Sequence, residues 1–426
     1  MKIKKVTYIA GLIAGVGVNL YATVQCRAEE NSHVTIHIFT TYTEELSDSG
    51  SAYFRQALEM AAEEFPDYTI LAESADTETY KTRIRTMAAS NEMPDIFFSW
   101  DSGFLEPFVN AGRVLPLDEY IDEDIRAEMK DEFLDEFCFE DRLYGIPSYR
   151  WVAVLYCNRE LYEKYNLEYP STFEELLKVC RVFRENGVTP MAVGMKDRWT
   201  GAQITNTFLV QLAGKEKALD MLSGEVEPDE TILKQAAGAT LKLSEAGAFP
   251  SNVLELTRDS AEDDFLSEKT AMEYMGTWVS EAIETSAVAE KIDAIPFPVL
   301  EGGDGSTFYG GNNGGLCVSS ACAYPKETAE VALYLARQSA MLAGKMSCWE
   351  VSEKSGTKSN RLEQEIINFT QNGEMVGAWD TMLPAIAGEK WLELNVQLYG
   401  QKISADQFAK QLSLKLRETK SYEEME

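Results

Sequence analysis

Apolar and polar positions alternate in two different periods along the first part of the chain. Segments with a period of two are rich in β-branched residues, which favours strands, and segments with apolar residues three or four apart favour helices. Pro66 ends the first of these helices. The pattern predicts strands over 34–40, 68–74 and 95–98, each followed by a helix, over 54–65, 77–90 and 104–112.

This order of strands and helices is typical of a parallel sheet covered by helices. In such sheets, ligands bind beyond the carboxyl ends of the strands. Two strand ends therefore provide candidate residues, although packing under a loop is the simpler explanation for any single Trp. The candidates are Phe39, Thr40 and Thr41 after the first strand, and Trp100, Asp101 and Ser102 after the third.

A second unit repeats this arrangement further along the chain. The apolar segment 151–158 predicts a strand, and Ser171 or Thr172 is suited to cap the helix that follows. The strand "PMAVG" leads to Trp199, and the strand 271–275 leads through Gly276 to Trp278. Three Trp residues are thus expected at three strand ends. The segments 329–341, 360–371 and 404–418 predict further helices.

Composition excludes some classes of partner. The chain has 426 residues, 45% of them hydrophobic, which is enough for two or three lobes with cores of their own. Its formal net charge is −31, and the acidic residues are spread along the sequence. Nucleic acids and anionic membrane surfaces attract basic patches, so we expect neither as a partner.

The N-terminus predicts export. The basic segment "MKIKK" precedes thirteen largely apolar residues, Tyr8 to Leu20, which is too short for a membrane span but typical of a signal peptide. Residues 1–28 form the expected signal, with cleavage after Ala28. The alternative is lipidation of Cys26, although Gln25 occupies a position where small residues are usual. The seven Cys residues show no paired spacing, and we expect mostly buried free thiols.

Signals for catalysis, metals and cofactors are weak. The two His residues, His33 and His37, share one strand face and are better explained as exposed positions than as metal ligands. No G-x-S-x-G or Walker A sequence occurs, and the segment "GGNNGG", Gly310 to Gly315, fits a turn or hinge better than a phosphate loop. We expect no metal and no cofactor. Carboxylates are abundant, which leaves a glycosidase pair open.

Aromatic rings beside Asp, Arg and Thr at strand ends suit a neutral polyol, whose faces are apolar and whose edges carry hydroxyls. In this context the chain resembles the extracellular solute-binding proteins (family 1) of bacterial ABC sugar importers, the class that includes maltose-binding protein. The order of five segments carries the resemblance: "MPDIFFSW…FLEPFVNAGRVLPLDEYI", "YGIPSYRWVAVLYCNRELYEKY", "PSTFEELLKVCRVFRENGVTPMAVG", "FLSEKTAMEYMGTWV", and the glycine-rich stretch before "LCVSSACAYPKETAEVALYLA".

The resemblance implies an α/β fold of two lobes, each a largely parallel sheet flanked by helices, that close around a ligand. Lobe one is expected to hold residues 33–147 and 299–345, and lobe two residues 150–297 and 349–426. The lobes would be joined by hinge crossings near 147–150, 296–299 and 345–349.

The resemblance also implies ligand contacts, most clearly at Trp278 in "MGTW". Trp379 and Trp391 fit either a cleft or a core position. The other implied ligand contacts are Trp199, Trp100, Phe39, Thr41, Asp101, Tyr149, Arg150, Trp151, Asp197 and Asn313.

By this resemblance we expect a monomeric, non-catalytic receptor, exported to the cell surface or periplasm. It would capture a sugar or oligosaccharide between its lobes and deliver it to the membrane permease of an ABC importer. Two alternatives are a secreted carbohydrate-active hydrolase and the same fold with a polyamine, amino acid or metal complex as its ligand. Arg150 and Arg198 near the expected cleft count against a cationic ligand.

Overall fold

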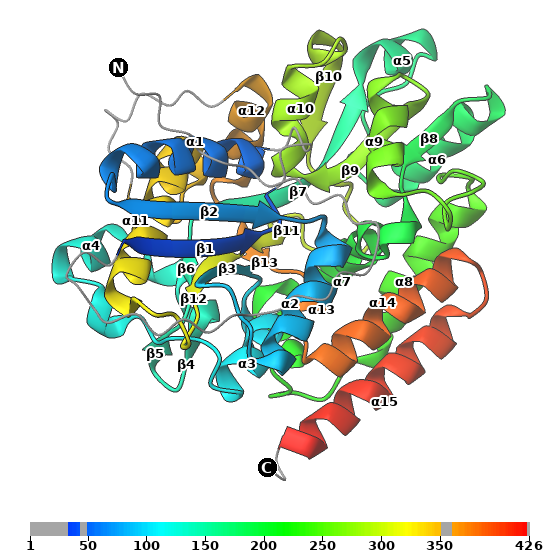
Figure 1. The fold of residues 1–426 in the computed structure, drawn as a ribbon. Helices are drawn as coiled ribbons and strands as arrows, with labels where there is room; N and C mark the ends of the chain where they lie inside the picture. Colours follow the sequence, from blue (N-terminus) through cyan, green and yellow to red (C-terminus); the bar gives the residue numbers. More distant parts are fainter. Residues whose placement is uncertain (1–32, 43–48, 351–359, 424–426) are drawn as a thin grey trace, which may run out of the picture.

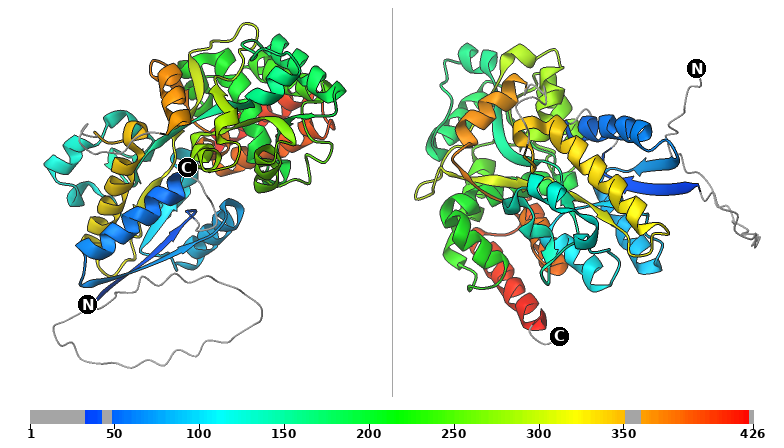
Figure 2. Two further views of the ribbon diagram at one scale, coloured as in Figure 1. Left: turned by 90° about the horizontal axis from the view of Figure 1, so that it is seen from above. Right: turned by 90° about the vertical axis from the view of Figure 1, so that its left-hand side faces the viewer.

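The structure, a computed structural model, describes residues 33–42, 49–350 and 360–423. These residues form two α/β lobes, which the left view of Figure 2 shows side by side. The predicted signal peptide and Cys26 lie outside the described residues. Within the described residues, no helix combines the length and the apolar content needed to cross a membrane.

Lobe one is built on a sheet with the strand order β2-β1-β3-β12-β6. The strands β1 to β3 are parallel, and β12 runs antiparallel to both β3 and β6. The helices α1 and α11, far apart in sequence, pack against each other over this sheet (Figure 1). The strands are β1 (Val34–Thr40), β2 (Tyr68–Ser74), β3 (Ile96–Ser99), β6 (Ile146–Pro147) and β12 (Gly315–Val318).

Lobe two is built on a sheet with the order β13-β11-β7-β9-β8, in which β10 also pairs with β7. Of the described strand pairs in this sheet, β8 with β9 and β11 with β13 are parallel, and the others are antiparallel. The two-lobe fold expected from sequence is confirmed, but both sheets are mixed rather than largely parallel. The strands are β7 (Arg150–Asn158), β8 (Thr189–Ala192), β9 (Thr270–Gly276), β10 (Ile292–Ile295), β11 (Thr307–Asn312) and β13 (Glu374–Val376).

Helices cover both sheets, and most of their positions agree with those predicted from the sequence. A separate hairpin in lobe one pairs β4 (Cys138–Phe139) with β5 (Arg142–Leu143). The helices of lobe one are α1 (Ser49–Glu64), α2 (Thr77–Ser90), α3 (Ser102–Asn110), α4 (Glu123–Glu128) and α11 (Pro325–Ala343). Those of lobe two are α5 (Arg159–Lys164), α6 (Phe173–Glu185), α7 (Trp199–Leu222), α8 (Glu230–Glu245), α9 (Arg258–Leu266), α10 (Ser280–Glu284), α12 (Arg361–Thr370), α13 (Trp379–Met382), α14 (Ala385–Tyr399) and α15 (Ala405–Glu423).

Helix α6 shows how local sequence sets these bounds. Thr172 accepts a hydrogen bond from the backbone N–H of Glu175, and the Glu175 carboxylate accepts one from the backbone of Thr172. This capping box satisfies two N–H groups that the helix itself cannot bond. Gly187, with φ of +76°, provides the left-handed turn that follows the helix. The same helix buries Leu176 and Phe183 completely, at about 1.5–3 kcal/mol each.

The chain passes between the lobes at three places. The first lies at residues 148–149, between β6 and β7, inside the expected range of 147–150. The second was expected near 296–299, but Val299 pairs with Thr172 inside lobe two. The chain stays in lobe two as β11 and passes to β12 only at residues 313–314, because β11 pairs antiparallel with β7.

The third passage was expected near 345–349. There the chain lies at the junction of the lobes, because Met346 packs in lobe two while Cys348 and Trp349 are buried in the core of lobe one. Five of the described Cys residues are buried free thiols, as expected, and Cys138 is exposed. Burial raises the pKa of each buried thiol, which keeps it protonated and unreactive at neutral pH.

Candidate functional site

A cavity of about 160 Å³ lies between the two lobes. It is bounded by the carboxyl ends of β1 and β3 on lobe one and by the starts of α7, α9, η5 (Thr277–Val279) and α13 on lobe two. The hinge strand β11 closes it on a third side. Its lining residues are Thr41, Tyr42, Thr77, Lys81, Phe98, Trp100, Asp101, Trp151, Trp199, Arg258, Trp278, Tyr309, Asn312, Asn313, Gly377, Ala378, Asp380 and Thr381.

Four aromatic rings from lobe two form a continuous group along this cavity. The ring centroid of Trp278 lies 6.1 Å from that of Trp199 and 5.0 Å from that of Trp151. Trp151 in turn packs edge-on against Tyr309, at 4.8 Å. The Trp151 indole donates a hydrogen bond to the backbone carbonyl of Asn312, at 2.9 Å, which satisfies its N–H and fixes the ring. Trp199 and Trp278 remain partly exposed and available for contact.

Lobe one provides Trp100 on its side of the cavity. The indole is held edge-on between Phe98 and Phe104, with centroid distances of 5.0 and 4.9 Å. The ammonium group of Lys81 lies 5.0 Å from the centroid of the Trp100 ring, a distance suited to a cation–π contact. Trp100 is partly exposed, so part of its surface remains free beside the cavity.

The cationic side chains that line the cavity face carboxylates. Lys81 lies 3.6 Å from Asp380 on the opposite lobe, and these two side chains are 12% and 8% exposed. The guanidinium of Arg258 lies 2.5 Å from Glu262 and 3.1 Å from Asp259. The two cationic side chains that line the cavity are therefore already paired with carboxylates.

Asp101 and Glu136 form a carboxyl pair at the edge of the cavity. Burial raises the pKa of Asp101 well above its ordinary value, and the charge and hydrogen bond of Glu136 add to this shift. The protonated form of Asp101 is therefore favoured more strongly than in an ordinary exposed carboxyl group. Glu136 also accepts a hydrogen bond of 2.8 Å from the side chain of Asn312, the last residue of β11. The pair thus connects the cavity to the hinge strand.

Seven of the eleven ligand-contact residues proposed from sequence line the cavity, and four lie elsewhere. Phe39 is 1% exposed and packs in the core of lobe one, with its centroid 4.6 Å from that of Tyr80. The residues in the cavity are Thr41, Trp100, Asp101, Trp151, Trp199, Trp278 and Asn313.

The other three residues lie near the hinge or behind the cavity wall. Tyr149 is 5% exposed, and its hydroxyl accepts a hydrogen bond of 2.5 Å from the side chain of Asn313. Arg150 begins β7 and pairs with Asn312 across the strands. Asp197 accepts a hydrogen bond of 2.5 Å from the backbone N–H of Arg258, so it positions a lining residue.

Sequence inspection missed several lining residues. Lys81 lies within an ordinary amphipathic helix, and nothing in its local sequence marks it. Asp380 follows Trp379 as Asp101 follows Trp100, a parallel that could have indicated it. Trp379 and Trp391, which fitted either a cleft or a core position from sequence, are 0% and 1% exposed and therefore belong to the core.

Metal ligands are not grouped in the described part of the chain. No set of three or more His, Cys, Asp or Glu side chains there could hold a metal ion. His33 and His37 are both exposed, as the sequence predicted.

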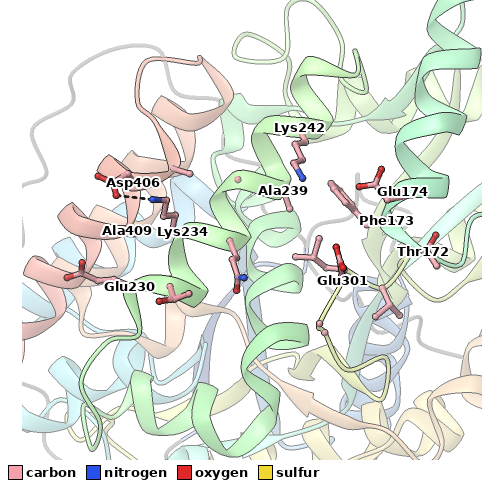
Figure 3. Close-up of a pocket in the computed structure, with 18 of the residues that line it drawn as sticks. Thr172, Phe173, Glu174, Glu230, Lys234, Ala239, Lys242, Glu301, Asp406 and Ala409 are labelled. Carbon is pink, nitrogen blue, oxygen red and sulfur yellow. Dashed lines mark hydrogen bonds and ion pairs between the residues drawn. The ribbon is translucent and has the colours of Figure 1, made fainter.

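A wider hollow of about 1280 Å³ lies on lobe two alone, between α8, α15, the start of α6 and residues 299–303 (Figure 3). Its walls carry scattered charges, including the ion pair of Lys234 with Asp406 at 3.2 Å. Among the residues that the structure describes, Phe173 is the only aromatic one that lines it. Because it neither joins the lobes nor gathers aromatic rings, the inter-lobe cavity is the better candidate for the functional site.

Comparison with known proteins identifies the class. Residues 48–341 match the family model for bacterial extracellular solute-binding proteins, and the chain belongs to that family. An uncharacterized ABC transporter extracellular-binding protein of Pyrococcus horikoshii is 24% identical over 51% of this chain and 50% of its own length. The xylose/arabinose-binding protein XacG of Haloferax volcanii is 26% identical over 59% of this chain and 57% of its own length. The matched region thus spans 50% and 57% of the length of these two relatives.

Solved structures extend the similarity to nearly the whole fold. A structure from a study of xylan utilization by Caldanaerobius polysaccharolyticus has a TM-score of 0.82 and 32% identity, covering 90% of this chain and 100% of that one. The protein RafE in complex with raffinose has a TM-score of 0.73 at 15% identity, covering 90% and 98%. The second similarity shows the fold alone.

Proposed function

We propose that this protein binds a neutral carbohydrate in the inter-lobe cavity and delivers it to the permease of an ABC importer. The main observation in support is that four Trp side chains line one cavity: Trp100 of lobe one and Trp151, Trp199 and Trp278 of lobe two. Aromatic faces pack on the C–H faces of a sugar ring, while its hydroxyls require hydrogen-bonding groups. Thr41, Asn313 and Thr381 supply such groups around the same cavity.

Two relatives support a pentose-containing ligand. XacG is named a xylose/arabinose-binding protein, and the structure at 32% identity comes from work on xylan utilization. We therefore propose xylose or a xylose oligosaccharide as the first ligand to test.

The charges that line this cavity favour a neutral group in it over an ionic one. An amino acid or polyamine would need an uncompensated charge in the cavity to replace its lost hydration. Lys81 and Arg258 both face carboxylates at 3.6 Å or less, so binding an ion there would require breaking an existing pair.

The hydrolase alternative gains no support from the cavity. Its carboxyl pair, Asp101 and Glu136, is joined by a hydrogen bond. The two carboxyl groups of a glycosidase are separated by about 5 Å or more, so that substrate or water fits between them. This pair is suited to holding the hinge and not to flanking a glycosidic bond.

Delivery to a permease requires a difference between the free and the ligand-bound forms. A ligand shifts the lobe equilibrium only as far as it binds the closed form more tightly than the open one. Because the aromatic rings come from both lobes, a sugar in contact with both gains the full set of contacts only on closure. We propose an exported receptor that acts at the cell surface or in the periplasm, as a monomer.

Calorimetric titration and thermal unfolding with xylose, xylobiose, xylotriose, maltose and raffinose test the proposal. A ligand that binds only the folded state raises the unfolding temperature. We expect binding of a xylose-containing sugar to wild type and weaker binding to Trp278→Ala. No binding of any sugar, or release of shortened sugars by the purified protein, would overturn the proposal.

A further inference from the structure

A second inter-lobe cavity, of about 370 Å³, adjoins the first. It lies between the helices α2 and α3 of lobe one and the segment 380–385 of lobe two. Asp380 lines both cavities, and Asp101 in the first is only two residues from Gly103 in the second. The aromatic lining is also continuous, because Trp100 packs at 4.9 Å on Phe104, which lines the second cavity.

This second cavity carries two arginines, Arg85 and Arg113. Neither forms an ion pair within 4 Å with a described carboxylate, although the chain has 70 acidic residues for 39 basic ones. The Arg85 guanidinium instead lies 5.1 Å from the centroid of Phe104. Arg113 donates a hydrogen bond to the side chain of Asn91, and its buried Nε has no hydrogen-bond partner among the described residues.

Two carboxylates near these arginines are already engaged by other cations. Asp380, the acidic residue that lines the cavity, lies 3.6 Å from Lys81. Glu389 accepts a hydrogen bond of 2.9 Å from Arg198, which is the main cause of its lowered pKa. The charge of Arg85 lowers that pKa to a smaller degree. Arg85 is exposed and Arg113 is partly buried, and both line the cavity with guanidinium donors that no described carboxylate pairs within 4 Å.

We propose that this second cavity binds a carboxylate carried by the sugar ligand, such as a uronic acid unit attached to the oligosaccharide held in the first cavity. The inference rests on the proposed function. A guanidinium bonds a carboxylate with two parallel N–H donors, and Phe104 and Pro107 line the same cavity beside the two arginines. The neutral part of the ligand would then set the position, and the carboxylate would add specificity.

The test is a calorimetric comparison of xylotriose with the same trisaccharide carrying one glucuronic acid unit. Free glucuronate serves as a third probe. Wild type is compared with the double variant Arg85→Gln/Arg113→Gln. Arg181→Gln is the matched control, because Arg181 is an exposed arginine on α6 that lines neither cavity. Thermal unfolding of each variant checks that it folds.

We expect wild type and the control to bind the acidic trisaccharide about tenfold more tightly than xylotriose, a gain that high salt reduces. The double variant should bind both trisaccharides with the affinity that wild type has for xylotriose. Equal affinities in wild type, or a gain that survives in the double variant, would overturn the inference. Free glucuronate that binds as tightly as the acidic trisaccharide would show a site for free acids instead.

Failure of the proposed function gives a different result. If only the acidic trisaccharide binds, and binding requires the two arginines, the inference holds and the neutral ligand is wrong. If neither trisaccharide binds, both fail.

Discussion

Lys81 and Asp380 face each other across the boundary between the lobes, with 3.6 Å between Nζ and Oδ2. Both side chains are nearly buried and line the aromatic cavity. Asp380 also lines the second inter-lobe cavity. An ion pair in such a position favours the closed arrangement, because opening the lobes separates the two charges. It also means that closure here does not depend on the ligand alone.

We predict that Lys81→Met shifts the protein toward the open form. Removing one member of a buried pair leaves the other charge uncompensated, which costs about 3–5 kcal/mol unless water can reach it. Opening the lobes lets water reach Asp380, so we expect a larger radius of gyration in solution scattering and at least tenfold weaker sugar binding.

Lys410→Met is the control, because Lys410 forms an exposed pair with Asp406 far from the cleft. The variant Lys81→Met/Asp380→Leu should recover part of the closed population, since no unpaired charge remains. Unchanged scattering by Lys81→Met without ligand would show that the pair does not hold the lobes together.

Gly103 of lobe one lies close against the backbone of lobe two. A Cβ placed there would collide with the carbonyl oxygen of Leu383, which belongs to lobe two. We predict that Gly103→Ala hinders closure and weakens sugar binding about tenfold or more. Each lobe should stay folded, because the collision disappears when the lobes open.

The control for this variant is Gly238→Ala. Gly238 lies in helix α8, where an added Cβ would meet only Ala405, at 3.9 Å. Alanine is favoured over glycine in a helix by about 0.5–1 kcal/mol, so stability should rise slightly and binding should not change. Calorimetry and chemical denaturation of both variants separate hindered closure from unfolding.

Trp278 and Trp391 should respond to truncation in opposite ways. Trp278 is partly exposed beside the cavity, so Trp278→Ala should weaken sugar binding about tenfold with a modest change in stability. Trp391 is 1% exposed in the core of lobe two, so Trp391→Ala should lose about 3–5 kcal/mol of unfolding free energy. Titration calorimetry and urea denaturation measure the two effects. Tight binding by Trp278→Ala would show that the ring does not contact the ligand.

The carboxyl pair of Asp101 and Glu136 should make stability depend on pH. Burial and the charge of Glu136 raise the pKa of Asp101 in the folded state above the value of about 4 that an unfolded chain shows. The folded protein then binds more protons than the unfolded chain above pH 4, so stability falls as pH rises from there toward the folded pKa.

Asp101→Asn removes this titration and keeps an N–H donor for Glu136. We therefore expect the variant to differ little from wild type near pH 4 and to be the more stable protein near pH 8, by unfolding temperature. Other buried carboxyl groups, including Glu273, are present in both proteins, so their effect on the pH dependence cancels when the variant is compared with wild type. Parallel curves over this range would contradict a raised pKa of Asp101 in the folded protein.

Local sequence predicted most of the secondary structure. The strand β2 and the helix α2 begin and end where the pattern of apolar residues placed them, because period, caps and proline act within a few residues. The Trp residues at strand ends were visible for the same reason. Together with the order of motifs, this determined the two-lobe fold and most of the aromatic cavity.

The remaining features depend on contacts between distant segments. The second crossing falls after Asn312 and not near Val299, because strand pairing with β7 holds β11 in lobe two. Phe39 was expected in the cleft but is buried in the core of lobe one. Only packing decides between such alternatives, since the same aromatic residue suits both.

The sequence by itself therefore determined the elements, the lobes and the presence of aromatic rings where strands end. The tertiary structure alone decided which charges meet: Lys81 with Asp380, and Asp101 with Glu136. The physical reason is range, because helical and strand periods are set by near neighbours, whereas an ion pair requires two folded lobes that bring distant residues within a few ångströms.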